Sequence, residues 1–174
     1  MDQIKVYDNF LNSEHLIKCK QIIKDGKWDY GHNSNNNNKM NTPFFYMDLK
    51  QNDFFTFELK EKIETELGLK VTVERVYANG QTFGLDGCFH QDSTDSDTIT
   101  FCLYISPIPN EDIGDIGGNI YFRVPTIEHF TLALEPRYNR GVSFPSSFFH
   151  KGAAFNRYVK NMRICIAWKL RVIS

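Results

Sequence analysis

The feature that most constrains the fold is a series of short strand-like segments that fills the chain after Gly68. Each segment is rich in β-branched and aromatic residues and is bounded by glycine, proline or asparagine, which are typical of turns. The predicted strands are residues 70–77, 83–91, 98–106, 119–124, 130–134, 141–144 and 163–170. The turn signals between them are Asn79-Gly80, Pro107-Ile108-Pro109, Gly117-Gly118 and Asn139-Arg140-Gly141. So many short strands in roughly a hundred residues predict a β-sandwich or jelly roll.

The first part of the chain predicts helices and two further strands. Residues 4–10 and 44–49 are the strand candidates. One helix is expected to begin at Asn12 or Ser13 and to end at Gly26, and a second is expected over 52–67 with Gly68 as its end. The apolar residues at helical spacing are Leu16, Ile17, Ile22 and Ile23 in the first helix, and Phe54, Phe55, Leu59, Ile63 and Leu67 in the second.

A chain of 174 residues suits one domain with a hydrophobic core, and no internal repeat or linker divides it. We therefore expect a single domain over 1–174 of the α+β class. In this interpretation residues 1–68 supply an N-terminal helical support, and residues 69–174 form the β-sandwich. Both helices are expected to pack on one outer face of the sandwich.

Several features point to the inside of a cell. No basic segment followed by an apolar one begins the chain, and no apolar run approaches the roughly 18 residues of a membrane helix. The four cysteines form no CxxC pair, so we expect reduced thiols, with Cys102 and Cys165 acting as small core residues. We predict a cytoplasmic protein without a membrane partner. The asparagine-rich and lysine-rich composition is typical of an AT-rich genome, such as that of a virus or phage.

Charge is segregated along the chain although the formal net charge is only −1. No lysine or arginine occurs from Val76 to Phe122, and no aspartate or glutamate occurs after Glu135. One interpretation is two solvated faces of opposite sign. The other is that the basic half holds an anionic ligand while the acidic half helps to hold a cation. The near-neutral total and the lack of a basic and aromatic cluster make nucleic acid an unlikely partner.

The tripeptide His90-Gln91-Asp92 is the first candidate for metal binding. On a strand, residues i and i+2 point to the same face, so this imidazole and this carboxylate would aim at one point. Together with one further histidine they would make the 2-His-1-carboxylate triad of non-haem iron oxygenases, which leaves coordination positions open. His150 is our choice for the third ligand, and His129 and His32 remain alternatives.

Arg163 opens an apolar strand, and a guanidinium at the end of a buried strand needs a carboxylate partner because its burial alone is costly. A bidentate contact to the distal carboxylate of 2-oxoglutarate would supply that partner. Arg157 and Lys160, in the preceding loop, are the alternatives.

The stretch from about Val71 to the end resembles the prolyl 4-hydroxylase-like branch of the 2-oxoglutarate/Fe(II)-dependent dioxygenase superfamily. The matching pieces are Arg75-Val-Tyr-Ala-Asn-Gly80, His90-Gln-Asp92, Thr98-Ile-Thr-Phe-Cys-Leu-Tyr-Ile105, Gly117-Gly-Asn-Ile-Tyr-Phe122, Leu134-Glu-Pro-Arg-Tyr-Asn-Arg-Gly141, His150 and Arg163-Ile-Cys-Ile-Ala-Trp-Lys-Leu170. The sequence departs from the branch in a longer spacing between Tyr77 and His90, and in Gly87 where a tyrosine is frequent.

The resemblance implies a double-stranded β-helix, also called a jelly roll or cupin-like fold, with residues 69–174 as the catalytic core. It implies His90, Asp92 and His150 as iron ligands. It also implies that Arg163 and Tyr104 bind the C5 carboxylate of 2-oxoglutarate and that Tyr77 lines the pocket. Gly117-Gly118 would form a tight turn before the strand that closes the pocket.

The implied cofactors are Fe(II), 2-oxoglutarate as cosubstrate, O₂ and, as an optional reductant, ascorbate. The implied activity is hydroxylation of an unactivated C–H with release of succinate and CO₂, and Asp92 favours hydroxylation over halogenation. The leading hypothesis is a protein or peptide substrate, with proline as the target. Alternatives are the same chemistry on a small molecule, a free amino acid or a nucleic acid base, and a non-catalytic jelly-roll binding protein.

The segment 31–41 contains four consecutive asparagines, Asn35, Asn36, Asn37 and Asn38. Such a polar run cannot bury enough surface to order itself, so we expect a mobile loop. A lid over the active site is the alternative hypothesis.

Overall fold

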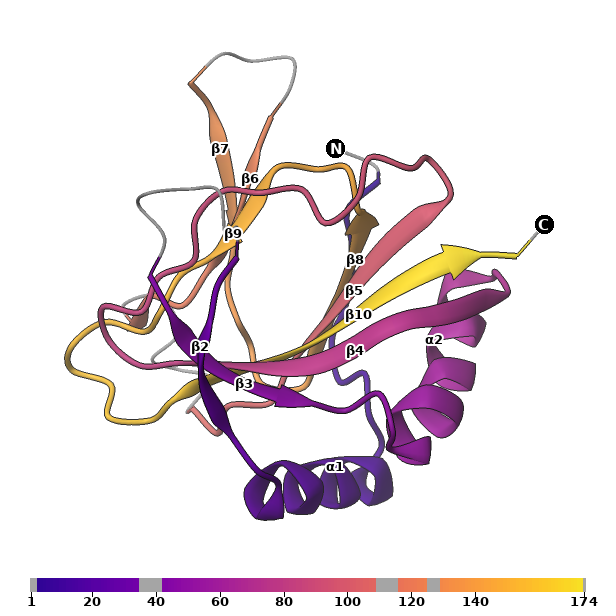
Figure 1. Ribbon diagram of the computed structural model, residues 1–174, viewed down its shortest axis with the longest axis horizontal. Coiled ribbons are helices and arrows are strands. Elements are labelled where there is room, and N and C mark those ends of the chain that lie inside the picture. The colour runs from indigo at the N-terminus through magenta and orange to yellow at the C-terminus, as the bar shows by residue number, and fades with distance from the viewer. Residues whose placement is uncertain (1–2, 35–41, 109–115, 125–128, 174) are drawn as a thin grey trace.

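The computed structural model describes residues 3–34, 42–108, 116–124 and 129–173, which form a mostly antiparallel β fold with two helical regions (Figure 1). The strands are β1 (Lys5–Tyr7), β2 (Asp29–His32), β3 (Phe44–Asp48), β4 (Val71–Gln81), β5 (Thr98–Tyr104), β6 (Ile120–Arg123), β7 (Thr131–Leu134), β8 (Arg140–Pro145), β9 (His150–Gly152) and β10 (Arg163–Val172). The helices are α1 (Ser13–Asp25), the π-helix η1 (Phe54–Glu58) and α2 (Leu59–Leu67).

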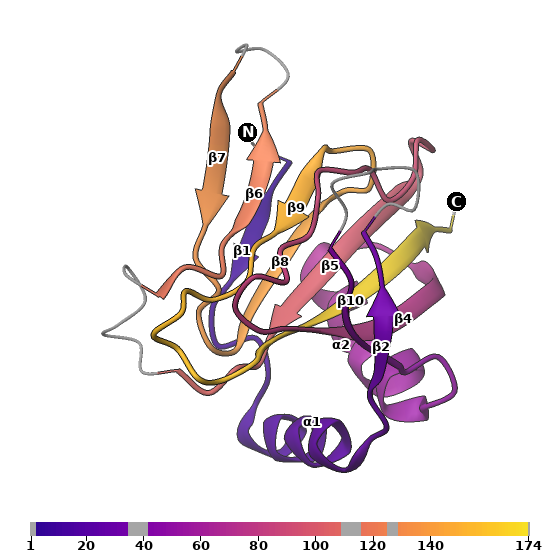
Figure 2. The same cartoon turned by 60° about the vertical axis from the view of Figure 1, so that its left-hand side comes forward.

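The strands form two sheets that face each other. The larger sheet has the order β1-β8-β5-β10-β4-β3-β2, and the smaller has the order β7-β6-β9. Figure 2 shows the smaller sheet standing beside the larger one, with α1 below and α2 behind the larger sheet. Strands β1, β2 and β3 come from the first 68 residues, so the N-terminal part adds to the larger sheet as well as supplying helices.

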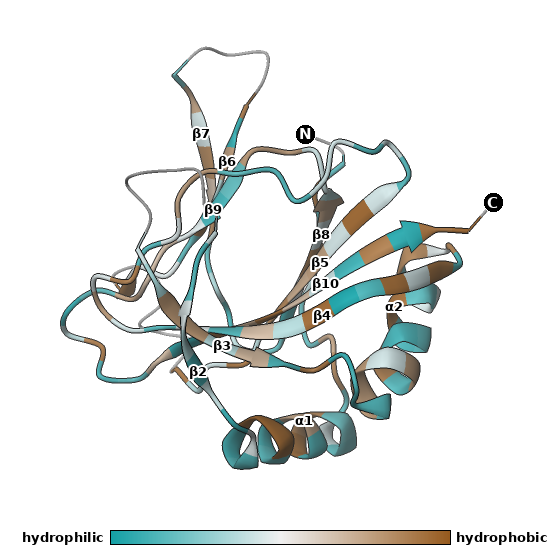
Figure 3. Ribbon diagram, in the orientation of Figure 1, coloured by the Kyte–Doolittle hydropathy of each residue, from teal (hydrophilic) through white to brown (hydrophobic). Residues whose placement is uncertain are grey.

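The two faces of the larger sheet are sorted by the alternation of side chains along its central strands. In β10, Ile166 and Trp168 belong to the hydrophobic cluster that also contains residues of the helices. Their neighbours Arg163, Cys165 and Lys169 point to the opposite face and line a pocket. Figure 3 shows the alternation as bands of differing hydropathy along β4 and β10. One face of the larger sheet therefore packs against the helices, while the other packs against the smaller sheet and lines the site.

Helix α1 begins and ends where the sequence predicts, whereas the helix predicted over 52–67 is the π-helix η1 followed by α2, which ends at Leu67 as expected. The Asn12 side chain accepts a hydrogen bond from the backbone N–H of His15, 2.8 Å away, which caps α1. Gly68 follows α2 with a φ of 68°, the left-handed conformation that glycine adopts most readily. Trp168 Nε1 donates to the carbonyl of Phe55, 3.0 Å away, and so connects the η1 region to the larger sheet.

Some element predictions are wrong. Ile17 is not on the core face of α1, because its side chain is 69% exposed. Residues 83–91 do not form a strand beyond an isolated bridge at His90. Asn79-Gly80 is not a turn but lies inside β4. A Cβ at position 80 would lie 2.5 Å from Met162 Sδ and 2.9 Å from Trp28 Cζ3, so Gly80 allows these two side chains to pack against β4.

Other predictions are confirmed or fall outside the description. The predicted strands at 4–10, 44–49, 98–106, 119–124, 130–134, 141–144 and 163–170 are present with shifted ends. Gly117 and Gly118 have φ values of 72° and 77°, a left-handed conformation that glycine adopts readily, and Gly117 forms an isolated bridge with Phe155. The asparagines at 35–38 lie outside the described residues. In the part of the chain that the structure describes, neither helical region has an apolar stretch long enough to cross a membrane.

Candidate metal centre and adjoining pocket

His90, Asp92 and His150 converge between the two sheets. Their ligand atoms all lie within 4.8 Å of one another. His90 Nε2 is 3.4 Å from Asp92 Oδ1, and His150 Nε2 is 3.4 Å from Asp92 Oδ2. Neither His32 nor His129 belongs to this cluster, so among the described residues the geometry favours His150 as the third member.

The local backbone explains why three residues so far apart in the sequence meet. His90 and His150 exchange two backbone hydrogen bonds of 3.0 Å and 2.9 Å, and the N–H of Asp92 donates to the carbonyl of Ser146 at 2.9 Å. The segment of His90 and Asp92 is therefore held against the start of β9. The side chains of His90 and Asp92 point toward the same site as predicted, although the two residues do not lie on a continuous strand.

Both histidines are oriented by backbone carbonyls. The Nδ1 atom of His90 lies 2.9 Å from the carbonyl oxygen of Cys88, and that of His150 lies 2.9 Å from the carbonyl oxygen of Phe148. Because a carbonyl can only accept, Nδ1 carries a hydrogen in each ring, and Nε2 is the nitrogen that faces Asp92. Burial lowers the pKa of His150 to about 4, so this ring is neutral at pH 7.

Asp92 is a buried carboxylate that remains ionised. Burial by itself would raise its pKa, but the charge of Lys169 holds the pKa well below its usual range. Asp92 Oδ2 accepts a hydrogen bond from Thr100 Oγ1 at 2.6 Å and also forms an ion pair with Lys169 Nζ. Burial opposes the charge of Lys169, yet Asp92 raises the lysine pKa above its ordinary value.

Sequence analysis missed Lys169. Its signal was a lysine at an even spacing from Arg163 in an apolar strand, which places both side chains on the same face of β10. Only the folded chain brings Asp92, which lies 77 positions earlier, to that face.

The donor set fits a divalent metal ion. Two imidazole nitrogens and one carboxylate converge within 4.8 Å of one another, and this is the donor set of the 2-His-1-carboxylate metal sites. Metal-binding histidines commonly donate their other ring N–H to a carbonyl, as both do here. The Thr100 and Lys169 contacts occupy Oδ2 and leave Oδ1 of Asp92 to a metal.

A pocket of about 260 Å³ extends from this cluster across the larger sheet. Its floor is a grid of side chains from β4, β10 and β5. The cross-strand neighbours are Gln81 and Arg163; Asn79, Cys165 and Tyr104; Tyr77, Ala167 and Cys102; and Arg75, Lys169 and Thr100. Arg163 stands at one end of the grid, and Lys169, beside Asp92, stands near the other.

Arg163 is buried and only partly satisfied by the protein. Its Nε donates to the carbonyl of Gly118 at 2.6 Å, and its Nη1 donates to Gln81 Oε1 at 2.7 Å. Its guanidinium carbon lies 5.1 Å from the Tyr104 ring centre. No acidic side chain of the described chain forms an ion pair with Arg163, which leaves Nη2 for an anionic ligand.

Two polar atoms of the pocket are buried without a hydrogen-bond partner in the described chain, the Tyr104 hydroxyl and Asn79 Oδ1. An unpaired buried polar group is costly, so such atoms indicate a missing ligand or water. The Tyr104 hydroxyl and Arg163 are donors that suit a carboxylate. Tyr77 also lines the pocket, whereas the alternatives Arg157 and Lys160 are not among the lining residues.

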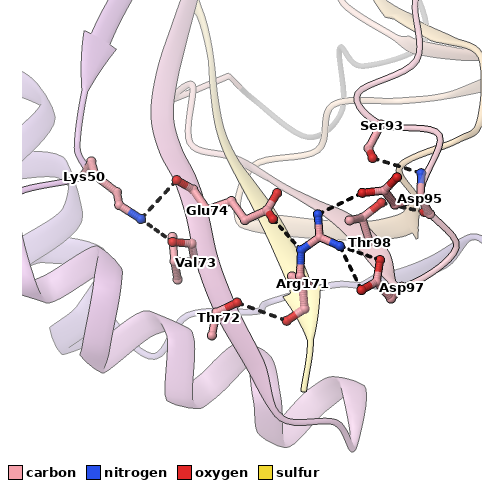
Figure 4. A network of polar contacts seen from close by, with 9 residues as sticks. All are labelled: Lys50, Thr72, Val73, Glu74, Ser93, Asp95, Asp97, Thr98 and Arg171. Atoms are coloured by element: carbon pink, nitrogen blue, oxygen red, sulfur yellow. Dashed lines mark hydrogen bonds and ion pairs between the residues drawn. The ribbon is translucent and has the colours of Figure 1, made fainter. Parts of the chain in front are cut away.

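The acidic and basic segments of the sequence pair with each other beside the site. Arg171 binds Glu74 at 2.6 Å, Asp95 at 2.9 Å and Asp97 at 2.7 Å, as Figure 4 shows. These contacts connect β10 and β4 to the loop that follows Asp92. Arg171 of the basic segment therefore pairs with Asp95 and Asp97 of the acidic segment, while Arg163 of the basic segment lies in the pocket.

Comparisons with known proteins show the same fold in oxygenases. No family model and no curated protein matches the sequence. An oxidoreductase of the 2OG-Fe(II) oxygenase family from Burkholderia pseudomallei superposes with a TM-score of 0.74 at 7% identity, over 98% of this chain and 85% of that one. A Trichoplax adhaerens prolyl hydroxylase in complex with a hypoxia inducible factor peptide fragment gives 0.71 at 16% identity, over 98% and 84%.

A third solved structure is the epimerase SnoN in complex with Fe³⁺, alpha ketoglutarate and nogalamycin RO. It superposes with a TM-score of 0.66 at 9% identity, over 97% of this chain and 78% of that one. These likenesses show that the chain has the fold shared by these enzymes.

Proposed function

We propose that the chain is an Fe(II)- and 2-oxoglutarate-dependent oxygenase built on a double-stranded β-helix, with residues 1–174 as one domain. The observation that carries the proposal is the cavity that joins the His90, Asp92 and His150 cluster to a buried Arg163 without an acidic partner in the described chain. A metal at one end and a dicarboxylic 2-oxo acid reaching the other would satisfy both sets of groups.

In this proposal each site residue has a separate role. His90 Nε2, Asp92 Oδ1 and His150 Nε2 would hold the iron, while Arg163 and the Tyr104 hydroxyl would bind the distal carboxylate of 2-oxoglutarate. Tyr77 would line the space between them. Bound iron with this cosubstrate would supply oxidation of an unactivated C–H by O₂, with succinate and CO₂ as coproducts and ascorbate as an optional reductant.

The protein contributes position and charge. The carbonyls of Cys88 and Phe148 fix the ring tautomers, and Lys169 with Thr100 keeps Asp92 ionised and correctly turned. Because the cavity floor is sheet, these groups are set before any ligand enters, which lowers the cost of reorganisation.

For the substrate, we propose a protein or peptide residue, with proline favoured. The support is the fold shared with a prolyl hydroxylase whose structure contains a peptide. A small-molecule substrate is the second candidate, and the fold shared with an epimerase that contains nogalamycin RO supports it.

The deciding experiment is an anaerobic titration of the metal-free protein with Fe(II) and 2-oxoglutarate. A weak visible charge-transfer band near about 500–530 nm is expected, as for 2-oxo acid chelates of Fe(II). Asp92→Ala should give no band, and Arg163→Gln should need much more 2-oxoglutarate to reach it. A wild-type protein that forms no band would contradict the proposal and favour a binding protein without this chemistry.

A further inference from the structure

Arg75 is a cation at the metal end of the pocket that has no acidic partner in the described part of the chain. It lies directly opposite Lys169 in the pairing of β4 with β10, and both residues line the pocket. Like charges directly opposite each other on a sheet destabilise it. Lys169 is neutralised by Asp92, and nearby Arg171 is surrounded by carboxylates, but Arg75 forms no ion pair with any residue that the structure describes.

An aromatic wall holds Arg75 at the edge of the pocket. Its guanidinium carbon lies 5.3 Å from the centre of the Tyr77 ring. The Tyr46 ring lies 5.5 Å from that of Tyr77, and His32 stacks on Tyr46 at 4.6 Å. Burial and the charge of Arg75 lower the pKa of His32, so the histidine adds no positive charge at pH 7. The rings of Tyr77, Tyr46 and His32 therefore orient the guanidinium of Arg75 while leaving it exposed, so that it can bind an anion.

The nearest acidic residue on the neighbouring strand has another contact. Asp48 is opposite Tyr77 in the pairing of β3 with β4, and its Oδ1 accepts a hydrogen bond from the N–H of Lys50 at 2.9 Å. No ion pair between Asp48 and Arg75 is present in the described chain. The positive charge of Arg75 is therefore not neutralised by an acidic side chain of the described residues.

The charges that line the pocket leave an excess of positive charge. Arg75, Arg163 and Lys169 face Asp92, the one carboxylate among the lining residues that the structure describes. A divalent metal and a 2-oxoglutarate dianion would cancel each other, so loading the site leaves the excess unchanged. The excess positive charge therefore favours the binding of an anionic substrate.

We propose that Arg75 is a specificity-determining residue that binds a carboxylate of the substrate and so places a neighbouring C–H at the metal. The substrate is accordingly an acid, either a free carboxylic acid or a peptide with an acidic residue beside its target. The guanidinium fork matches a planar carboxylate, and the Tyr77 ring fixes its plane. This inference rests on the proposed oxygenase function.

The test measures the binding of paired probes to protein loaded with Mn(II) and 2-oxoglutarate, by isothermal calorimetry. One pair is acetyl-prolyl-aspartyl amide and acetyl-prolyl-asparaginyl amide, and the other is L-proline and L-prolinamide. In wild type the acidic member of one pair should bind at least about tenfold tighter than its neutral partner, the scale of a charge-assisted hydrogen bond. The pair that shows the preference identifies a peptide or a free acid as the source of the carboxylate.

Three variants make the result specific. Arg75→Gln should remove the preference for the acidic probe and leave the affinity for 2-oxoglutarate unchanged. Arg75→Glu should reverse the preference, so that acetyl-prolyl-lysyl amide or L-prolinamide binds more tightly than the acidic probe. Arg157→Gln is the matched control, because Arg157 lies 5.2 Å from the ring of Tyr158, outside the pocket, and should keep the preference.

Equal binding of acidic and neutral probes by wild type, or a preference that survives in Arg75→Gln, would overturn the inference. The visible band with Fe(II) and 2-oxoglutarate serves as an independent readout of the metal centre. A wild type without that band contradicts the proposed function, and this inference with it. A normal band with equal probe binding overturns only the role of Arg75.

Discussion

The buried hydroxyl of Tyr104 shows how a single unpaired atom reports on a ligand. Tyr104 is 1% exposed, and its hydroxyl has no hydrogen-bond partner in the described chain. Burial raises the tyrosine pKa well above its ordinary value, so the group stays a neutral donor. Tyr138 has a buried unpaired hydroxyl too, but it does not line the pocket. Comparing variants of the two tyrosines can therefore distinguish an effect on ligand binding from an effect on packing.

Tyr104→Phe should leave the melting temperature of the metal-free protein unchanged or higher, because it removes an unsatisfied buried group. The same change should weaken 2-oxoglutarate binding by about tenfold, because a hydrogen bond to a charged carboxylate is lost. Thermal unfolding and anaerobic 2-oxoglutarate titration would measure the two effects. Tyr138→Phe should match the first effect without the second, and an unchanged 2-oxoglutarate affinity in Tyr104→Phe would exclude the contact.

Lys169 is the other residue whose role depends on a buried partner. Replacing it in Lys169→Met should lower the melting temperature of the metal-free protein, since Asp92 would lose its cation inside the fold. The rise in melting temperature on addition of Mn(II) should then exceed that of wild type, because the metal becomes the main counter-charge. Lys169→Arg retains the charge and is the control. Equal Mn(II)-induced shifts in all three proteins would contradict this role.

At the scale of elements, Glu64 secures the join between α2 and β4. Its buried carboxylate accepts the backbone N–H of Val71 at 2.8 Å and pairs with Lys60 and Lys70, each at 3.1 Å. Burial by itself would raise its pKa, but these partners lower the pKa below the ordinary value of 4.5. The helix end and the strand start are thereby held by one side chain.

Glu64→Ala should destabilise the protein by about 1–3 kcal/mol, because the N–H of Val71 loses its partner in a buried site. Urea denaturation at neutral pH would measure this, with the exposed Glu61→Ala as a control of near-zero effect. A group with a depressed folded pKa stabilises above its unfolded pKa and loses this contribution as pH falls through the folded value. The difference between wild type and Glu64→Gln should therefore shrink below about pH 4.5. A difference independent of pH would show that the charge is not involved.

At the scale of the whole molecule, a metal would add a polar connection between two sheets that already share a hydrophobic cluster. His150 belongs to the smaller sheet, while Asp92 is bonded to Thr100 and Lys169 of the larger sheet. A metal held by both would fix the smaller sheet over the pocket. The likeness over nearly the whole chain to oxygenases of 7% and 16% identity shows that this two-sheet frame tolerates almost complete sequence change.

Metal binding should therefore slow amide hydrogen exchange in the segments 86–92 and 146–152, which meet at the paired backbone of His90 and His150. Helix α1, on the far side of the larger sheet, should exchange at the same rate with and without Mn(II). Mass spectrometry of peptic fragments would resolve the three regions. Uniform protection, or none, would contradict a metal that joins the sheets.

Much of this arrangement followed from the sequence, because it depends on local patterns. The end of α2 at Gly68, the alternation of β10 and the polar spacing of His90 and Asp92 are all encoded within a few residues. The selection of His150 and Arg163 came from the resemblance and from the cost of burying an arginine. The structure places both residues beside the pocket that contains His90 and Asp92.

The remainder was decided by pairing between distant segments. Strands β2 and β9 are too short to show a periodicity of their own, and they exist because β3 and β6 offer a partner edge. Asn79-Gly80 resembles a turn locally but is held straight by β10 and β3 on either side. The ion pair of Lys169 with Asp92, and the position of Arg75 opposite Lys169, depend on strand register. Register is a property of the whole sheet that no local pattern contains, so only the tertiary structure could reveal these contacts.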